Sequence, residues 1–277
     1  MKKLSLFFLT IILFITGCAS APINREFTLQ GDHGQLSAVL HTPAHKQMYP
    51  LVIIMHGFNA NKKMGLLTDL SAQLNKRGIA TLLFDFNGHG QSEGSFLDMT
   101  IPNELEDARR VYAYAEKLPN VTSISLTGHS MGAVVGAMLA GELGCQKIKT
   151  LVLMSAAPEI TQDTAKGDLF GVHYDPKNVP QYITLSNGLK VGRAFLATTP
   201  RVPIYAIAAR YTGPVLVIHS KDDQLVPYRY GVEFSHIYEH AQFEALEGLD
   251  HNFTQDTAGV NRQIVDYLAA TLLKPVD

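Results

Sequence analysis

Residues 123–137 read SISLTGHSMGAVVGA and join an apolar run, a sharp turn and a second apolar run. The run before Gly128 has the alternation of a strand, and the run after Ser130 has the composition of a buried helix. The Gly-x-Ser-x-Gly pattern between them is typical of a turn that strains the serine backbone and lifts its hydroxyl above a sheet. Side chains at Gly128 or Gly132 would collide with neighbouring chain in such a turn. The stretch therefore predicts Ser130 as a nucleophile, the alternative being a structural turn.

Short apolar runs alternate with helical stretches through most of the chain. This alternation predicts an α/β fold, with a mostly parallel central sheet flanked by helices. Residues 51–55 and 216–218 are apolar on both faces, as strands covered by helices on two sides must be. We predict strands at 36–41, 51–56, 81–86, 123–127, 150–155, 214–219 and 242–246, and helices at 66–76, 102–117, 131–143 and 260–273.

The alternation stops between Pro158 and Ala209. This segment is rich in proline, with glycine and tyrosine between the prolines, and it separates two predicted core strands. We therefore expect residues 19–277 to form one domain that carries an inserted cap over the site at about 158–209. Caps of this kind determine substrate specificity.

A serine hydroxyl needs a base that removes its proton, and the base needs an acid that fixes its tautomer. In this architecture the acid follows a late strand, and a histidine precedes the last helix. His251 has this position. Asp222 and Asp223 both follow the strand at 214–219, and related hydrolases often carry H-G-x-x-D-x-x-V-P there. The run 219–227 matches with its acid at Asp223, so Asp223 is the prediction and Asp222 the alternative.

The negative oxygen of a tetrahedral intermediate needs backbone N–H donors. One is expected from Met131, directly after the nucleophile, where the N-terminus of the following helix also favours negative charge. The other is expected from the loop after the strand at 51–56, and Phe58 is the candidate. Gly57 allows close approach of the backbone, and His56 is expected to stabilise the loop.

Three further stretches carry a family resemblance. Residues 56–62 read HGFNANK, residues 84–94 read FDFNGHGQSEG and residues 250–253 read DHNF. Together with the serine turn they resemble bacterial feruloyl (cinnamoyl) esterases of the α/β-hydrolase superfamily, over most of the chain after about residue 30. The resemblance implies hydrolysis of small-molecule esters of hydroxycinnamic, related aryl or short acyl groups with sugars or small alcohols. It implies no cofactor.

The same resemblance assigns residues in the cap. Asp163 matches an acidic residue that contacts the phenolic end of the substrate. Phe170 and Phe195 stand where the family has a polar amide and a tyrosine hydroxyl. A buried hydroxyl without a partner costs about 1 to 3 kcal/mol, so this departure favours less polar acyl groups. The alternative is that both phenylalanines are ordinary core residues of the cap.

The first 18 residues differ from the rest of the chain. Two lysines precede an apolar stretch at 4–16, which is too short to cross a bilayer and is typical of an export signal. The run Ile15-Thr16-Gly17-Cys18 resembles the bacterial lipobox, so Cys18 is expected to carry a lipid anchor that holds an exported protein on the cell envelope. The alternative is a secretory signal cut at about 19–21, with a secreted or periplasmic product. Cys145 then has no disulfide partner, and we expect it to be a packing residue.

Composition and charge exclude several classes. The chain has 277 residues, 46% of them hydrophobic, and a formal net charge of −2. No basic cluster predicts binding to nucleic acid, and no spaced set of histidines and carboxylates predicts a metal site. The sequence makes no prediction of an oligomeric state. Other reactions of the same fold stay open: a monoacylglycerol lipase, a thioesterase, or an aminopeptidase that would hold an amine through acidic cap residues such as Glu159, Asp163 and Asp168. A non-catalytic binding lipoprotein is the remaining alternative.

Overall fold

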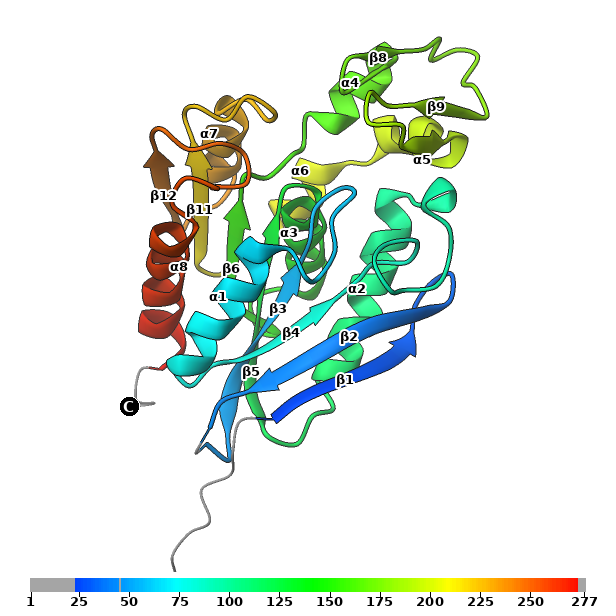
Figure 1. The fold of residues 1–277 in the computed structure, drawn as a ribbon. Helices are drawn as coiled ribbons and strands as arrows, with labels where there is room; N and C mark the ends of the chain where they lie inside the picture. The colour runs from blue at the N-terminus through cyan, green and yellow to red at the C-terminus, as the bar shows by residue number, and fades with distance from the viewer. Residues whose placement is uncertain (1–22, 45, 274–277) are drawn as a thin grey trace, which may run out of the picture.

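The computed structural model describes residues 23–44 and 46–273. Their core is an eight-stranded sheet in the order β1-β2-β4-β3-β5-β6-β11-β12. Strands β4 to β12 of this order are parallel, whereas β1 and β2 are antiparallel to their neighbours. The predicted α/β fold is confirmed (Figure 1). The strands are β1 (Ile23–Gln30), β2 (Gln35–Thr42), β3 (Tyr49–Met55), β4 (Ala80–Phe84), β5 (Val121–His129), β6 (Ile148–Met154), β11 (Val215–Ser220) and β12 (Ala241–Leu246).

Two helical layers cover the sheet. Helices α1 (Gly65–Lys76) and α8 (Thr257–Leu272) pack on one face, and α2 (Ile101–Ala115) and α3 (Met131–Leu143) pack on the other (Figure 1). Strand β3 shows why both faces must be apolar, because successive side chains point to opposite sides. Leu51, Ile53 and Met55 join the core beneath α2 and α3, while Val52 and Ile54 join the core beneath α1 and α8.

The cap lies between β6 and β11 in the sequence and above the carboxyl end of the sheet in space (Figure 1). It is built from short elements where the sequence predicted only an irregular segment. Two small hairpins and several helical turns make up its framework. They are α4 (Ile160–Lys166), β7 (Asp168–Leu169), β8 (Val172–His173), β9 (Tyr182–Thr184), β10 (Lys190–Gly192), α5 (Arg193–Thr198), η2 (Thr199–Arg201) and α6 (Ile204–Ala208).

The structure corrects the sequence analysis at four points. Strand β1 was not predicted, because as an edge strand it has partly polar faces. Helix α7 (Arg229–His236) and the short helix η1 (Phe96–Asp98) were also missed. Cys145 is exposed and not packed, because it follows Gly144 at the C-terminal end of α3. The predicted signal segment and Cys18 lie outside the described residues.

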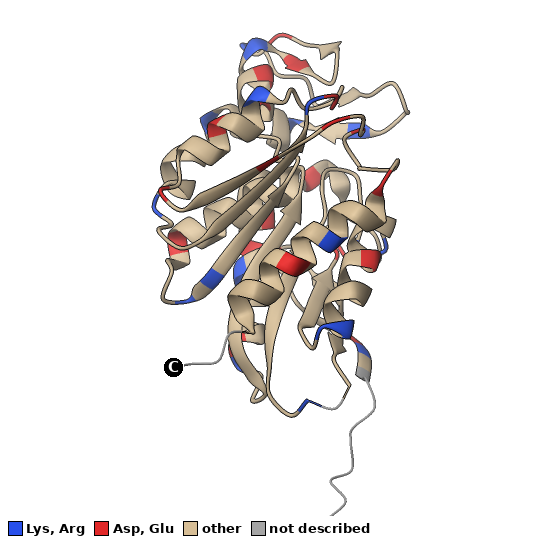
Figure 2. Cartoon of the chain, turned by 90° about the vertical axis from the view of Figure 1, so that its left-hand side faces the viewer, with Lys and Arg blue, Asp and Glu red and all other residues tan. Residues whose placement is uncertain are grey.

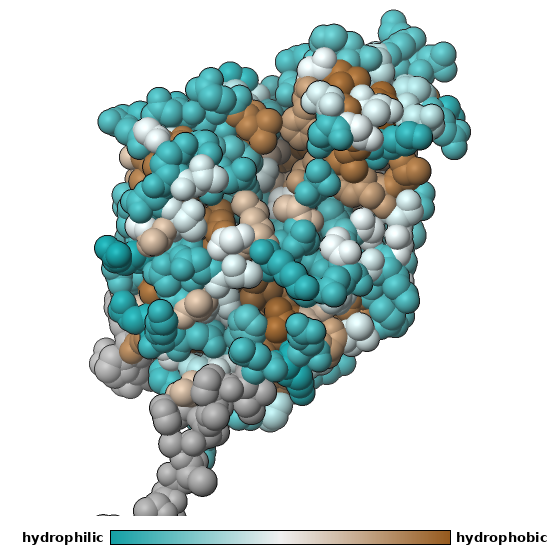
Figure 3. Space-filling model, viewed as in Figure 1, coloured by the Kyte–Doolittle hydropathy of each residue, from teal (hydrophilic) through white to brown (hydrophobic). Residues whose placement is uncertain are grey.

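The described surface has mixed charge. Figure 2 shows acidic and basic residues interspersed on one side of the molecule. Figure 3 shows hydrophobic residues on the cap and beside the hollow between the cap and the body. Within the described residues no helix is long and apolar enough to cross a membrane, and no group of histidine, cysteine and carboxylate side chains could hold a metal ion.

Candidate active site

Ser130 stands in the turn between β5 and α3. Its backbone has φ 56° and ψ −120°, a conformation that a side-chain-bearing residue rarely adopts. A Cβ atom on Gly128 would lie 2.2 Å from the carbonyl oxygen of Gly132, and one on Gly132 would lie 2.3 Å from that of His56. Neither glycine can therefore be replaced without moving backbone. The turn has the strained geometry that the sequence predicted.

Asp223 and His251 are brought together at the same end of the sheet. His251 Nδ1 donates to Asp223 Oδ2 at 2.8 Å. The other carboxylate oxygen accepts the backbone N–H groups of Leu225 and Val226, both at 2.9 Å. His219 Nε2 lies 3.2 Å from Asp223 Oδ2 and 3.0 Å from the carbonyl oxygen of Val226, so its N–H is shared between these two acceptors. The neighbouring Asp222 instead accepts the N–H of Gly248 at 2.6 Å, so the structure places Asp223 and not Asp222 on the histidine.

These donors decide the ionisation of Asp223. Burial alone would raise the pKa of this carboxyl, but the hydrogen bonds from His219 and His251 hold its pKa well below the usual range. The carboxylate is therefore charged at neutral pH. Because it accepts the proton on Nδ1 of His251, it fixes the tautomer of the ring and leaves Nε2 unprotonated. His219 was predicted to have a structural role, and no signal in the sequence showed that it contacts the acid.

His129 supports His251 from the other side. Its Nε2 donates to the backbone carbonyl of His251 at 2.9 Å, and the two rings lie 4.8 Å apart. Burial lowers the pKa of His129 to about 3, so its ring is neutral. A neutral ring at this position joins the serine turn to the His251 loop without placing a positive charge beside His251.

The two predicted oxyanion donors are the backbone N–H groups of Met131, directly after Ser130, and of Phe58, which lines the cavity with Ser130. Among the described residues no acceptor is found for the N–H of Met131 or of Phe58. His56 Nδ1 donates to the carbonyl of Gly57 at 2.9 Å, and its Nε2 accepts the N–H of Phe86. Because a peptide group is planar and its C=O and N–H point in opposite directions, this bond turns the N–H of Phe58 away from His56. Burial lowers the pKa of His56 to about 3, which keeps the ring neutral and in this role.

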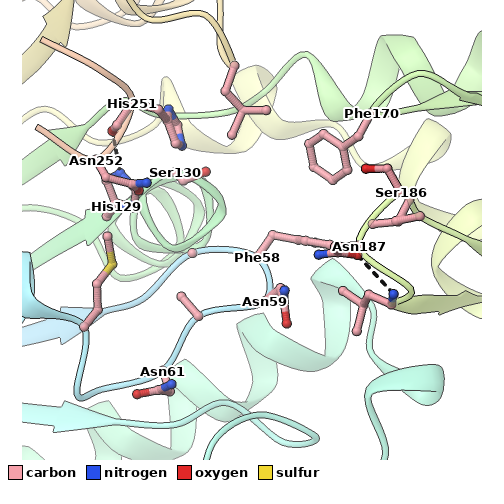
Figure 4. A pocket seen from close by; sticks show the side chains of 16 residues that line it. Phe58, Asn59, Asn61, His129, Ser130, Phe170, Ser186, Asn187, His251 and Asn252 are labelled. Carbon is pink, nitrogen blue, oxygen red and sulfur yellow. Dashed lines mark hydrogen bonds between the residues drawn. The ribbon is translucent and has the colours of Figure 1, made fainter. Parts of the chain in front are cut away.

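A cavity of about 510 Å³ opens above Ser130 (Figure 4). Figure 4 shows Ser130 and His251 at one end and Phe170, Ser186 and Asn187 of the cap at the other. Asn59, Asn61 and Asn252 add amide groups, and none of the described Asp, Glu, Lys or Arg residues lines the cavity. Ser186 and Asn187 of the β9–β10 hairpin were missed by the sequence analysis because polar loop residues there have no distinguishing pattern.

A second cavity of about 330 Å³ adjoins the first, and Phe170 and Leu225 line both. It is bordered by Glu159, Asp163 and Asp168 together with Arg229. The buried Glu159 has one carboxyl oxygen without a partner, and burial raises its pKa to about 8. Glu159 is therefore neutral at pH 7.

The three predicted cap residues thus have different positions. Asp163 lines the second cavity, and Phe170 lines both cavities with 41% of its surface exposed. Phe195 is fully buried and lines neither cavity. Its ring packs against that of Phe58, with 5.6 Å between the centroids, and is not part of the wall of either cavity.

The comparison that decides the family is with a solved structure of Est1E from Butyrivibrio proteoclasticus with ferulic acid bound. The two chains are 30% identical, with a TM-score of 0.86, over 90% of this chain and 100% of Est1E. The chain belongs to the α/β-hydrolase superfamily. The family model of the serine aminopeptidases S33 also matches residues 46–173. The predicted similarity to feruloyl esterases is confirmed, and the protein is a hydrolase.

Two relatives with lower identity are vertebrate proteins. Human protein ABHD12B is 24% identical, over 69% of this chain and 51% of the relative. The lysophosphatidylserine lipase ABHD12 of Danio rerio is 23% identical, over 80% of this chain and 59% of the relative. The chain spans about half the length of these relatives.

Proposed function

We propose that this hydrolase cleaves carboxylic esters through Ser130, His251 and Asp223. The observation that carries the proposal is the hydrogen bond from His251 to the buried Asp223, together with the cavity that His251 lines with Ser130 on its strained turn. A binding protein would have no need of the strain at Ser130 or of two unpaired N–H groups beside it.

The reaction follows from the positions of these groups. Ser130 Oγ attacks the ester carbonyl while His251 Nε2 takes its proton. The carbonyl oxygen becomes negative and accepts the N–H groups of Met131 and Phe58. The C–O bond to the alcohol then breaks, and His251 returns the proton to the departing oxygen. Water repeats the sequence on the acyl-enzyme, with His251 as base, and releases the acid and Ser130. These steps need no cofactor.

The proposed acyl groups are hydroxycinnamoyl, aryl or short acyl groups. Est1E binds ferulic acid and supports this class. The rings of Phe58 and Phe170 and the side chain of Leu225 offer apolar contact near Ser130, and Asp163 offers an acceptor farther away. The small-molecule ester is the only partner that this proposal requires.

An aminopeptidase is the second candidate, since Asp163 and Asp168 border the adjoining cavity. Two observations weaken the aminopeptidase candidate. Asp168 is already paired with His173 at 2.9 Å, and the neutral Glu159 offers no charge to an amine. Esters are therefore favoured over amino-terminal peptide bonds.

We propose further that Cys18 carries a lipid anchor and that the protein is exported. Strand β1 begins at Ile23, which pairs with Thr42 at the end of the sheet opposite to Ser130 (Figure 1). Five residue steps span at most about 17 Å. An anchor at Cys18 would therefore hold the cavity on the side away from the membrane, which favours diffusible esters over bilayer lipids. Radioactive palmitate should label the full chain in bacteria but not its Cys18→Ser variant, and equal labelling would contradict the anchor.

Ester hydrolysis by the domain without residues 1–18 tests the function. Methyl ferulate, methyl cinnamate, p-nitrophenyl acetate and an aminoacyl amide should be compared with the Ser130→Ala variant as control. We expect the esters to be hydrolysed, the amide to be spared and the variant to lose about 10³-fold or more in kcat. Preferential cleavage of the amide would favour the aminopeptidase.

A further inference from the structure

The side chain of Phe58 lies at the centre of an aromatic cluster. Its ring contacts those of Phe96, Phe170 and Phe195, with centroid separations of 5.3, 5.2 and 5.6 Å. All three contacts are edge-to-face, the arrangement that aromatic quadrupoles favour. Phe170 and Phe195 belong to the cap, and Figure 4 shows Phe58 and Phe170 in the same cavity. The cap thus contacts the residue that carries a proposed oxyanion donor.

The two cap rings differ in how firmly they are held. Phe195 lies on α5 and is fully buried. The backbone beside it packs directly on η1, since a Cβ atom on Gly192 would lie 1.9 Å from the carbonyl oxygen of Leu97. Phe170 is partly exposed at the tip of the β7–β8 hairpin, with φ 52°. Phe195, whose neighbouring backbone packs on the helix that carries the half-buried Phe96, therefore forms the buried side of the cluster, and Phe170 forms an open side.

The backbone of Phe58 depends on this support. On one side, His56 holds the Gly57 carbonyl and thereby the plane of the Gly57–Phe58 peptide. On the other side, the ring of Phe58 is held by its aromatic neighbours, so a shift of the ring would tilt the N–H. Preorganised donors lose much of their effect when they move, and a displacement of about 1 Å can cost about 10²-fold in rate.

We propose that Phe195 is a positioning residue for the oxyanion hole, which acts through the ring of Phe58 and together with Phe96. This role rests on the proposed function. Since Phe195 lines neither cavity, it affects every ester alike and does not select the acyl group. The cap therefore contributes to the rate through Phe195 and to specificity through Phe170.

The test compares Phe195→Leu and Phe96→Leu with Phe234→Leu. Phe234 is a matched control because it is also fully buried and in ring contact, 5.0 Å from Tyr205, but it lies on α7 and lines neither cavity. For each variant kcat and KM are measured on p-nitrophenyl acetate and methyl ferulate, with the melting temperature. The inhibition constant of an aryl trifluoromethyl ketone, which forms a tetrahedral adduct with a serine, reports the oxyanion hole itself.

We expect Phe195→Leu and Phe96→Leu to lower kcat by about tenfold on both esters with KM unchanged. The inhibition constant of the ketone should rise by a similar factor in these two variants. Phe234→Leu should keep the wild-type kcat. A rise in KM for methyl ferulate alone, unchanged kcat, or an equal loss in Phe234→Leu would overturn the proposal. Phe96→Leu decides the matter if Phe195→Leu does not fold. Failure of a fluorophosphonate to label Ser130 in the wild-type protein would instead contradict the proposed function.

Discussion

Two buried carboxyl groups follow strands at the same end of the sheet, and they differ in ionisation. Asp223, after β11, accepts N–H groups from Leu225, Val226, His219 and His251, and its pKa is lowered. Glu159, after β6, has an oxygen without a partner, and its pKa is raised to about 8. Burial raises the pKa of both carboxyl groups, but at Asp223 the hydrogen bonds outweigh it, whereas at Glu159 the charges of Asp163 and Asp223 add to it. Asp223 is thus held in its charged form beside His251, whereas Glu159 is held in its neutral form beside the second cavity.

The largest effect is expected where the charge is removed. Asp223→Asn should lower kcat by about 10⁴-fold, because an amide cannot hold His251 in the required tautomer. Asp222→Asn is the matched control: it affects only the hydrogen bond to Gly248 and should keep most of the activity. Steady-state kinetics on p-nitrophenyl acetate measure both. A greater loss in Asp222→Asn would exchange the two assignments.

A smaller effect is expected at the wall that both cavities share. Phe170→Ala should raise KM for methyl ferulate by about tenfold, the effect of losing part of an apolar contact. It should change kcat on p-nitrophenyl acetate much less than Phe195→Leu does, because Phe170 is on the open side of the cluster. The ratio of kcat/KM between the two esters measures this change. An unchanged ratio would show that Phe170 does not contact the acyl group.

The smallest effect is expected at Glu159 and concerns stability. The Glu159 carboxyl loses its proton near pH 4.5 in the unfolded chain but only near pH 8 in the folded protein, because burial raises its pKa. Its contribution to stability is therefore complete below about pH 4.5 and is lost as the pH rises through about 8. Glu159→Gln should make the melting temperature fall less between pH 5 and pH 9. Asp163→Asn removes a neighbouring charge that contributes to the raised pKa of Glu159, so it should reduce that slope, but less than Glu159→Gln does. Parallel profiles for wild type and Glu159→Gln would contradict a neutral Glu159.

The body could be predicted from the sequence better than the cap. The glycines around Ser130 and the two-sided apolar strand β3 are local patterns with one structural solution each, and the predicted strands lie within a few residues of those observed. His219 and Phe195 could not be assigned in this way. The role of Phe195 comes from its contact with Phe58, more than a hundred residues away, and such a contact depends on tertiary packing, which leaves no local pattern. His219 lies only four residues before Asp223, but the sequence does not show how the chain turns after β11 to bring the ring onto the acid.

The most direct test of the central claim is to trap the acyl-enzyme. The domain without residues 1–18 should be mixed with p-nitrophenyl acetate, quenched in acid within milliseconds, digested and analysed by mass spectrometry. We predict a 42 Da acetyl adduct, on the order of one per chain, on the peptide that contains Ser130, together with a burst of nitrophenol and with neither in Ser130→Ala. Turnover without an adduct at Ser130, or with the adduct on another residue, would contradict the account.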